Sequence, residues 1–194
     1  MDVGIYGPVA GYLASLLAVA AGFVLSGTAP ANATAVMVRF GGQPLTIRLV
    51  HAVLLHWNPA LPTFDRIAPH PVLVAGWIGL FITALNLIPG GQLDGGHLLY
   101  AISPRLHRYA TNLLPFVLVI LGVYFWIGWI LWGLFLLIPA MRHPRVPLHA
   151  RLSRGRALLG LAGLATLLLT FTPTPFSHAS LLYFFPAGAL AAAR

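Results

Sequence analysis

Asp94 is the residue whose type and position point most directly to chemistry. The chain has 194 residues and only three acidic ones, Asp2, Asp65 and Asp94. Asp94 closely follows an apolar run over residues 72–88. A carboxylate at membrane depth costs roughly 2.5–3.5 kcal/mol on insertion scales. A carboxylate in such a position is therefore expected to ligate a metal, bind an ion or relay a proton.

The residues around Asp94 predict an interruption of the helix. The string from Asn86 to His97 is Asn-Leu-Ile-Pro-Gly-Gly-Gln-Leu-Asp-Gly-Gly-His, and its proline and glycines disfavour a continuous helix. Irregular backbone at membrane depth is tolerated only where protein or a water-filled cavity surrounds it. The string is therefore predicted to be a site. The alternative is a plain turn or helix cap, because Asp-Gly-Gly is ordinary turn chemistry.

The metal-ligating residues near Asp94 are too few for a hydrolytic zinc site. A catalytic zinc ion takes three protein ligands, from histidine, cysteine, aspartate or glutamate, and one water. Asp94 could supply one ligand. His97 could be a second ligand, a partner of a ligand or a structural donor. The metalloprotease helix His-Glu-x-x-His is absent from this sequence, which contains no glutamate and no cysteine.

The histidines upstream of Asp94 do not form a recognisable metal pair. His51 and His56 are five residues apart, which places them about 140° apart on an ideal helix. Helical zinc pairs are instead four residues apart, with both rings on one face. This pair is therefore not expected to bind metal, and the sequence assigns no role to His51, His56 or His70.

The composition predicts an integral membrane protein. The chain is 59% hydrophobic and only 7% charged, whereas soluble domains carry about 25% charged residues. We therefore expect an all-α fold, a polytopic transmembrane helix bundle that forms a single membrane domain over residues 1–194, with a broken helix at the Asp94 string. The expected spans are residues 3–25, 72–88, 113–140 and 157–171, with short apolar helices at 45–57 and 180–193.

The net charge of +8 comes from arginine, since the chain has no lysine. Several arginines lie in short segments between apolar runs, where they set topology by the positive-inside rule. No nucleic-acid partner is expected, because no recognition fold accompanies the charge. The expected surroundings are the lipid bilayer, in a multi-pass protein of a prokaryotic cell membrane.

The stretch over residues 113–140 permits two interpretations. As one helix it would be roughly 42 Å long, more than the ~30 Å hydrocarbon core. Alternatively it is a tight hairpin that turns near Gly122 or Gly128, which would place the arginines on its two sides together. Length favours one tilted helix and charge favours the hairpin, so both remain open.

Small residues recur every four positions in the first apolar segment. Gly7, Gly11 and Ser15 form one such ridge, and Pro8 fits a first helical turn. Ridges of this kind let membrane helices approach closely. We therefore expect Gly7, Pro8 and Gly11 to serve helix packing.

The central string resembles the third signature segment of the site-2 protease family, the intramembrane zinc metalloproteases. The family pattern Asn-x-x-Pro followed by Leu-Asp-Gly stands here in register, from Asn86 to Gly95. Residues 4–11, Gly-Ile-Tyr-Gly-Pro-Val-Ala-Gly, resemble the family's Gly-Pro-Leu-Ala-Gly helix start. His70-Pro71 and His143-Pro144 also resemble family positions.

The resemblance implies a role for each residue of the string. Asp94 would be the third ligand of a Zn²⁺ cofactor, and a membrane protein helix would be the substrate. Asn86 would line the site and hold the peptide or its oxyanion. Pro89, Gly90 and Gly91 would break the helix so that Asp94 can turn toward the metal. Gly95, Gly96 and His97 would line the site or lie around the metal ligands.

The family's His-Glu-x-x-His helix is expected upstream of residue 1. Three explanations follow: the sequence is a fragment or a late start, a non-catalytic paralogue, or a chain completed by ligands from another chain. The general-base glutamate is likewise absent, so the chain alone is expected to be inactive.

Three classes of function follow from these observations. The first is the C-terminal part of a site-2-type protease, which acts in regulated proteolysis of membrane proteins. The alternative is a non-catalytic membrane protein that binds transmembrane helices on the same fold, and either could self-associate. An ion or proton transporter is disfavoured, because the spans offer few other ionisable groups besides Asp94.

Overall fold

A computed structural model of the chain describes residues 3–29, 42–138, 154–177 and 180. This part is mostly helical, as the sequence predicts. Its helices are α1 (Val3–Leu25), α3 (Leu45–Trp57), α4 (Pro71–Asn86), α5 (Asp94–Ile102), α6 (Pro104–Tyr124), α7 (Gly128–Leu137) and α8 (Arg154–Thr170). Strands β1 (Gly27–Thr28) and β2 (Ile67–Ala68) pair antiparallel. The predicted helix at 180–193 lies outside the described residues.

The helices differ in whether they are long enough to cross a membrane. Within the described residues, Tyr6–Leu25 of α1 and all of α6 have the length and composition of a span. The apolar helices α3, α4, α7 and the described apolar part of α8 are shorter. The predicted number of spans therefore stays a prediction.

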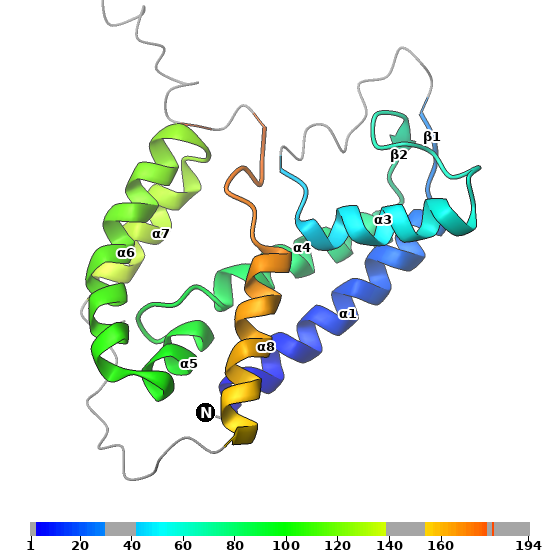
Figure 1. The fold of residues 1–194 in the computed structure, drawn as a ribbon. Helices are drawn as coiled ribbons and strands as arrows, with labels where there is room; N and C mark the ends of the chain where they lie inside the picture. The colour runs from blue at the N-terminus through cyan, green and yellow to red at the C-terminus, as the bar shows by residue number, and fades with distance from the viewer. Residues whose placement is uncertain (1–2, 30–41, 139–153, 178–179, 181–194) are drawn as a thin grey trace, which may run out of the picture.

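Helices α1 and α4 pack closely along much of their length, and α3 crosses α1 (Figure 1). Small residues permit this approach. A Cβ added at Gly22 would collide with the main chain of Leu73, and one added at Gly76 would lie 2.8 Å from the Val19 nitrogen. A Cβ added at Gly11 would lie 3.4 Å from the Thr83 hydroxyl oxygen, whereas Gly7 is exposed and a Cβ added there would meet nothing within 4 Å.

Gly22→Ala is expected to weaken the contact between α1 and α4. Its methyl group must displace the main chain of Leu73, and overpacking of this kind costs about 1–3 kcal/mol. Thermal unfolding in detergent micelles should show a lower Tm. Gly7→Ala is the matched control, because its methyl group enters open space; equal Tm values for the two variants would contradict the packing.

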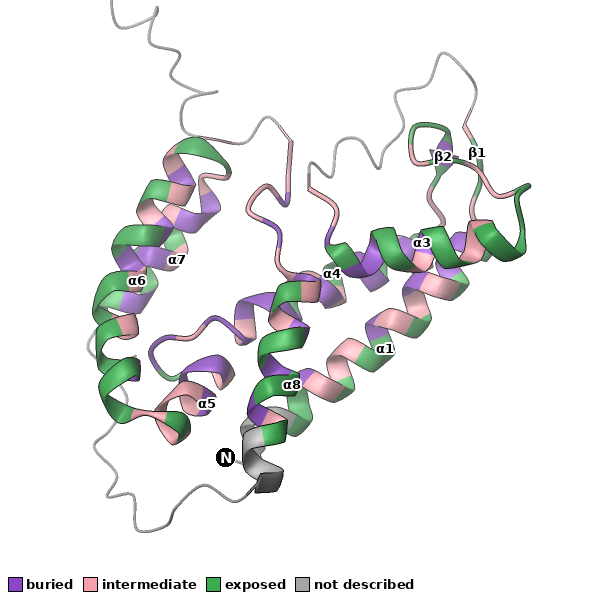
Figure 2. Ribbon diagram, in the orientation of Figure 1, coloured by how far each residue is buried: buried purple, intermediate pink, exposed green. Residues whose placement is uncertain are grey.

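Two hydrophobic clusters hold the chain that leads to Asp94. The first joins α1, α3, β2 and α4, with Trp77 of α4 almost fully buried. The second joins the end of α4 to the α6–α7 pair around Trp129. Phe81 packs against both clusters. Figure 2 shows buried positions continuing from α4 into the segment before α5, so this segment begins from a fixed helix end.

The stretch over residues 113–140 holds two helices, which is the hairpin alternative as far as the described residues extend. Helix α6 ends at Tyr124, α7 begins at Gly128, and the two pack together (Figure 1). A Cβ at Gly122 would collide with the Ile130 side chain, so a small residue is needed where the helices meet. Trp129 is fully buried and donates a hydrogen bond from Nε1 to the Pro173 carbonyl at 2.8 Å.

Candidate functional site

The Asp94 string forms a loop between two helices. Helix α4 ends at Asn86, α5 begins at Asp94, and residues 87–93 connect them. The Leu87 N–H still bonds to the Thr83 carbonyl at 3.0 Å, and the Gly90 N–H bonds to the Ile88 carbonyl at 2.8 Å. Gly91 has a φ of 59°, a left-handed conformation that favours glycine. The glycine therefore lets the chain turn into α5.

The first turn of α5 rests directly on the backbone of this loop. A Cβ added at Gly95 would collide with the Leu87 carbonyl. One added at Gly96 would lie 2.7 Å from the Gly90 oxygen. Both glycines are buried. Loop and helix start therefore form one packed unit, and this close approach requires glycine at both positions.

Asp94 is the first residue of α5 and is partly buried. A carboxylate in the first turn is favoured by the positive end of the helix dipole. His97 lies one turn later, and its backbone N–H bonds to the Leu93 carbonyl at 2.9 Å. Asn86 is the last residue of α4 and is also partly buried.

These residues do not make a complete zinc site. Among the residues that the structure describes, no three histidine, cysteine, aspartate or glutamate side chains are grouped closely enough to hold a metal ion. Asp94 and His97 offer two ligating groups at most, whereas catalytic zinc takes three. The described part of the chain does not fit a catalytic zinc ion by itself.

The upstream histidines have separate structural positions. His51 is buried between the rings of Phe23 and Phe64, and its Nε2 lies 3.0 Å from the Pro62 carbonyl. His56 is exposed on the same helix. His70 precedes α4 and accepts the Val72 N–H at 3.3 Å through Nδ1. His51 thus contacts the loop that follows α3, and His70 caps the start of α4.

Two polar residues that sequence reasoning missed hold the loop from the other side. His107 and Thr111 of α6 both contact Gly91. The His107 Nε2 lies 3.1 Å from the Gly91 oxygen, and the Gly91 N–H donates to the Thr111 hydroxyl at 3.2 Å. Their spacing of four puts both side chains on one helix face. A histidine and a threonine at this spacing, shortly after the Asp94 string, were the sequence signal from which the two residues could have been found.

An apolar cavity of about 380 Å³ lies beside the start of α5. The loop contributes Leu87 and Pro89, α5 contributes Gly95 and Leu98, and α8 closes the other side between Gly160 and Leu167. The position next to Asp94 therefore borders apolar space that could accept an apolar side chain.

Comparison with known proteins gives a consistent family match. Residues 1–125 match peptidase family M50. The probable zinc metalloprotease EGY1, chloroplastic, of Oryza sativa subsp. japonica is 33% identical over 150 residues, which cover 75% of this chain and 25% of that protein. Its counterpart of the same name in Arabidopsis thaliana is 31% identical over 179 residues, covering 90% of this chain and 32% of the relative.

A third relative extends the match along nearly the whole chain. The probable zinc metalloprotease EGY2, chloroplastic, of Oryza sativa subsp. indica is 28% identical over 187 residues, covering 91% of this chain and 32% of that protein. The chain thus spans about a quarter to a third of the length of these relatives. No solved structure gives a significant match.

Proposed function

The chain belongs to peptidase family M50, and from this premise we propose that it forms part of an intramembrane zinc metalloprotease of the site-2 type. The observation that carries the proposal is the loop at residues 87–93, which starts α5 at Asp94 inside the matched region. In this proposal Asp94 is one ligand of the zinc ion. The remaining ligands and the general base come from a segment outside this chain.

The neighbouring residues take supporting roles in the same proposal. Asn86 lines the site and offers its amide to the substrate peptide. Pro89, Gly95 and Gly96 shape the loop that presents Asp94, and His97 supports the ligand. The apolar cavity beside Gly95 suits side chains of a membrane-embedded substrate segment. Pro8 and Gly11 serve the packing of the first helix, whereas a side chain at Gly7 would face open space.

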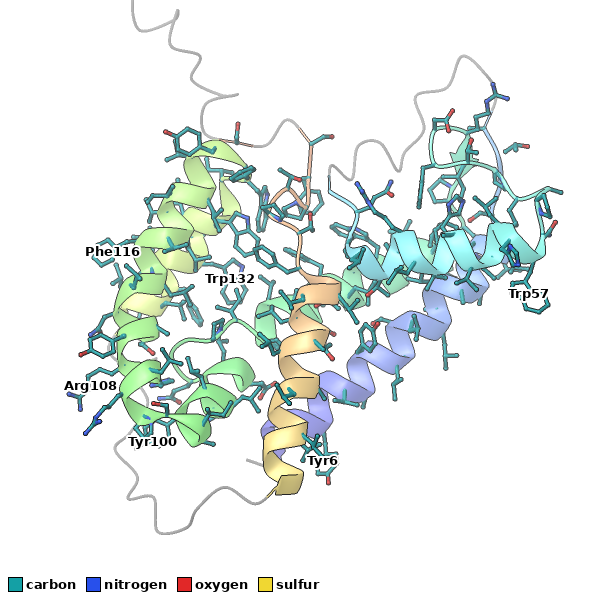
Figure 3. All side chains as sticks on the ribbon, in the orientation of Figure 1. Tyr6, Trp57, Tyr100, Arg108, Phe116 and Trp132 are labelled. Atoms are coloured by element: carbon teal, nitrogen blue, oxygen red, sulfur yellow. The ribbon has the colours of Figure 1, made fainter. Side chains whose placement is uncertain are left out.

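The surface of the described residues supports placement in a membrane. Tyr6, Trp57 and Phe116 point away from the bundle (Figure 3), and their exposed fractions are 65%, 82% and 62%. Leu17 in the middle of α1 is 72% exposed. Lipid would cover such side chains in the proposed multi-pass arrangement, in which residues 1–194 form one membrane domain. The predicted location in a prokaryotic cell membrane stays a prediction, since the relatives are named as chloroplastic.

Arg108 supports the same placement at the edge of the membrane. It is exposed near the start of α6 and points outward (Figure 3). Arg105 is exposed one turn earlier. Arginines at a span end suit the headgroup region, where they meet anionic lipid.

A non-catalytic helix-binding protein is the second candidate, because the described residues supply too few zinc ligands. Expression of the full reading frame that contains this chain separates the two. The purified protein is reconstituted in liposomes with a single-span membrane substrate. It is expected to cleave the substrate and to hold about one zinc ion per protein molecule, since a catalytic zinc ion takes three protein ligands at one site. A chelator should stop cleavage and added zinc should restore it. A folded protein with neither zinc nor cleavage would support the helix-binding alternative and contradict the protease.

A further inference from the structure

Gly91 is held to helix α6 through both of its backbone polar groups. Its carbonyl oxygen lies 3.1 Å from the His107 Nε2, and its N–H donates to the Thr111 hydroxyl at 3.2 Å. His107 is buried, with 5% of its surface exposed. The His107 Nε2 also lies 3.3 Å from the Thr111 hydroxyl oxygen. We call His107, Thr111 and Gly91 the loop clamp.

The geometry assigns the hydrogen atoms of the loop clamp. A carbonyl oxygen only accepts, so the His107 Nε2 carries the hydrogen that binds the Gly91 oxygen. The Thr111 hydroxyl oxygen accepts the Gly91 N–H. Tyr100 of α5 packs edge-on against the His107 ring at a centroid distance of 5.4 Å. The imidazole is thus held in one orientation by contacts with the loop, α5 and its own helix.

The loop clamp is mechanically connected to Asp94. Gly91 is only three residues before it. The start of α5 also packs on the loop, because Gly96 lies against the Gly90 and Gly91 carbonyls and Gly95 against the Leu87 carbonyl. A shift of Gly91 relative to α6 would therefore move the first turn of α5, which carries Asp94.

We propose that His107 and Thr111 are positioning residues that fix Asp94 by clamping Gly91 to helix α6. The value of that positioning for catalysis depends on the proposed role of Asp94 as a metal ligand. The clamping itself does not. Removal of the clamp should lower substrate turnover by about 10–100-fold, the range typical when groups that support metal ligands are lost.

The test uses a probe of the loop that needs no activity. The chain contains no cysteine, so Gln92→Cys gives one thiol in the loop, at a position that is exposed. A nitroxide attached there reports loop mobility by electron paramagnetic resonance in detergent micelles. His107→Leu and Thr111→Val should each increase the mobile fraction. His107→Gln keeps an N–H donor and Thr111→Ser keeps the hydroxyl, so both should restore the immobile spectrum.

Thr166→Val is the control for loss of a threonine hydroxyl that forms a hydrogen bond away from the loop. The Thr166 hydroxyl donates to the Ala162 carbonyl within α8, at 2.9 Å, and its removal should leave the label immobile. An immobile label in folded His107→Leu protein, with Tm and helical content unchanged, would overturn the proposal. If that variant does not fold, Thr111→Val and Thr111→Ser decide it, and identical spectra for this pair would also overturn it.

Cleavage assays on the full reading frame separate this proposal from the proposed function. There, His107→Leu should lower kcat with little change in KM, and His107→Gln should recover most of it. If the unmodified protein cleaves but His107→Leu retains full kcat, the positioning role is wrong while the protease function stands. If the unmodified protein never cleaves but the loop becomes mobile in His107→Leu, the function is wrong while the loop clamp stands.

Discussion

Asp94→Ala is expected to reduce cleavage of a membrane substrate by at least about 100-fold in the full reading frame, since loss of groups that merely support metal ligands already costs 10–100-fold. The substitution removes the proposed ligand and leaves a zinc site with one protein ligand fewer than catalysis needs. The bound zinc per protein should fall together with the cleavage rate. Substrate cleavage in liposomes and metal analysis of the same preparations measure the two effects.

Asp65→Ala is the matched control for this experiment. Asp65 lies in the loop before β2, is 75% exposed, and approaches Arg66 only to 3.9 Å. An exposed pair of this kind contributes about 0–1 kcal/mol, so this variant should cleave normally and keep its zinc. Asp94→Asn keeps the shape of the side chain and removes its charge, and should be as inactive as the alanine variant. Normal cleavage by either Asp94 variant would show that Asp94 is not a ligand.

The local features of the fold could be predicted from the sequence because their causes are local. The apolar run with interspersed polar residues at 45–57 predicted a short helix with those bounds, and the structure has α3 there. The apolar run over 72–88 corresponds to helix α4, which ends two residues earlier, at Asn86; its role as a membrane span stays a prediction. Proline and glycine after Asn86 end α4 by steric and hydrogen-bonding effects within a few residues.

The contacts between helices could not be predicted in the same way. The requirement for glycine at Gly22 depends on the approach of Leu73, far along the chain. The choice between one helix and a hairpin over residues 113–140 depends on packing between Gly122 and Ile130, which length and charge did not determine.

The loop clamp is the clearest omission at the site. The sequence placed Asp94, Asn86 and His97 in one string. The spacing of His107 and Thr111 put both side chains on one helix face, but nothing in the sequence connected that face with Gly91, 16 residues before His107. The contact between His107 and Gly91 exists because α5 is short and packs against α6, so that α6 lies beside the loop. Tertiary contacts of this kind have no periodic pattern in the sequence.

Gly95→Ala is expected to lower both stability and activity, because the space that its methyl group needs holds backbone. The added carbon would collide with the Leu87 carbonyl, which has no side-chain torsion with which to move away. The collision can be relieved only if the start of α5 moves away from the loop, and overpacking of this kind lowers stability by about 1–3 kcal/mol. Asp94 is the neighbouring residue and would move with it. A misplacement of about 1 Å in a catalytic group can cost 100-fold in rate.

Gly160→Ala tests whether this effect is specific to the loop. Gly160 is a buried glycine that lines the same cavity, from α8. Its added carbon would lie 3.2 Å from Cδ1 of Ile102, the flexible end of a side chain, which can shift by rotation. Gly160→Ala should therefore keep a nearly normal Tm, while Gly95→Ala loses several degrees of Tm and, compared with the unmodified protein, at least about tenfold in cleavage. If Gly95→Ala kept the Tm of Gly160→Ala and the cleavage rate of the unmodified protein, the close contact between α5 and the loop would not control the position of Asp94, and the site would have to be held by other contacts.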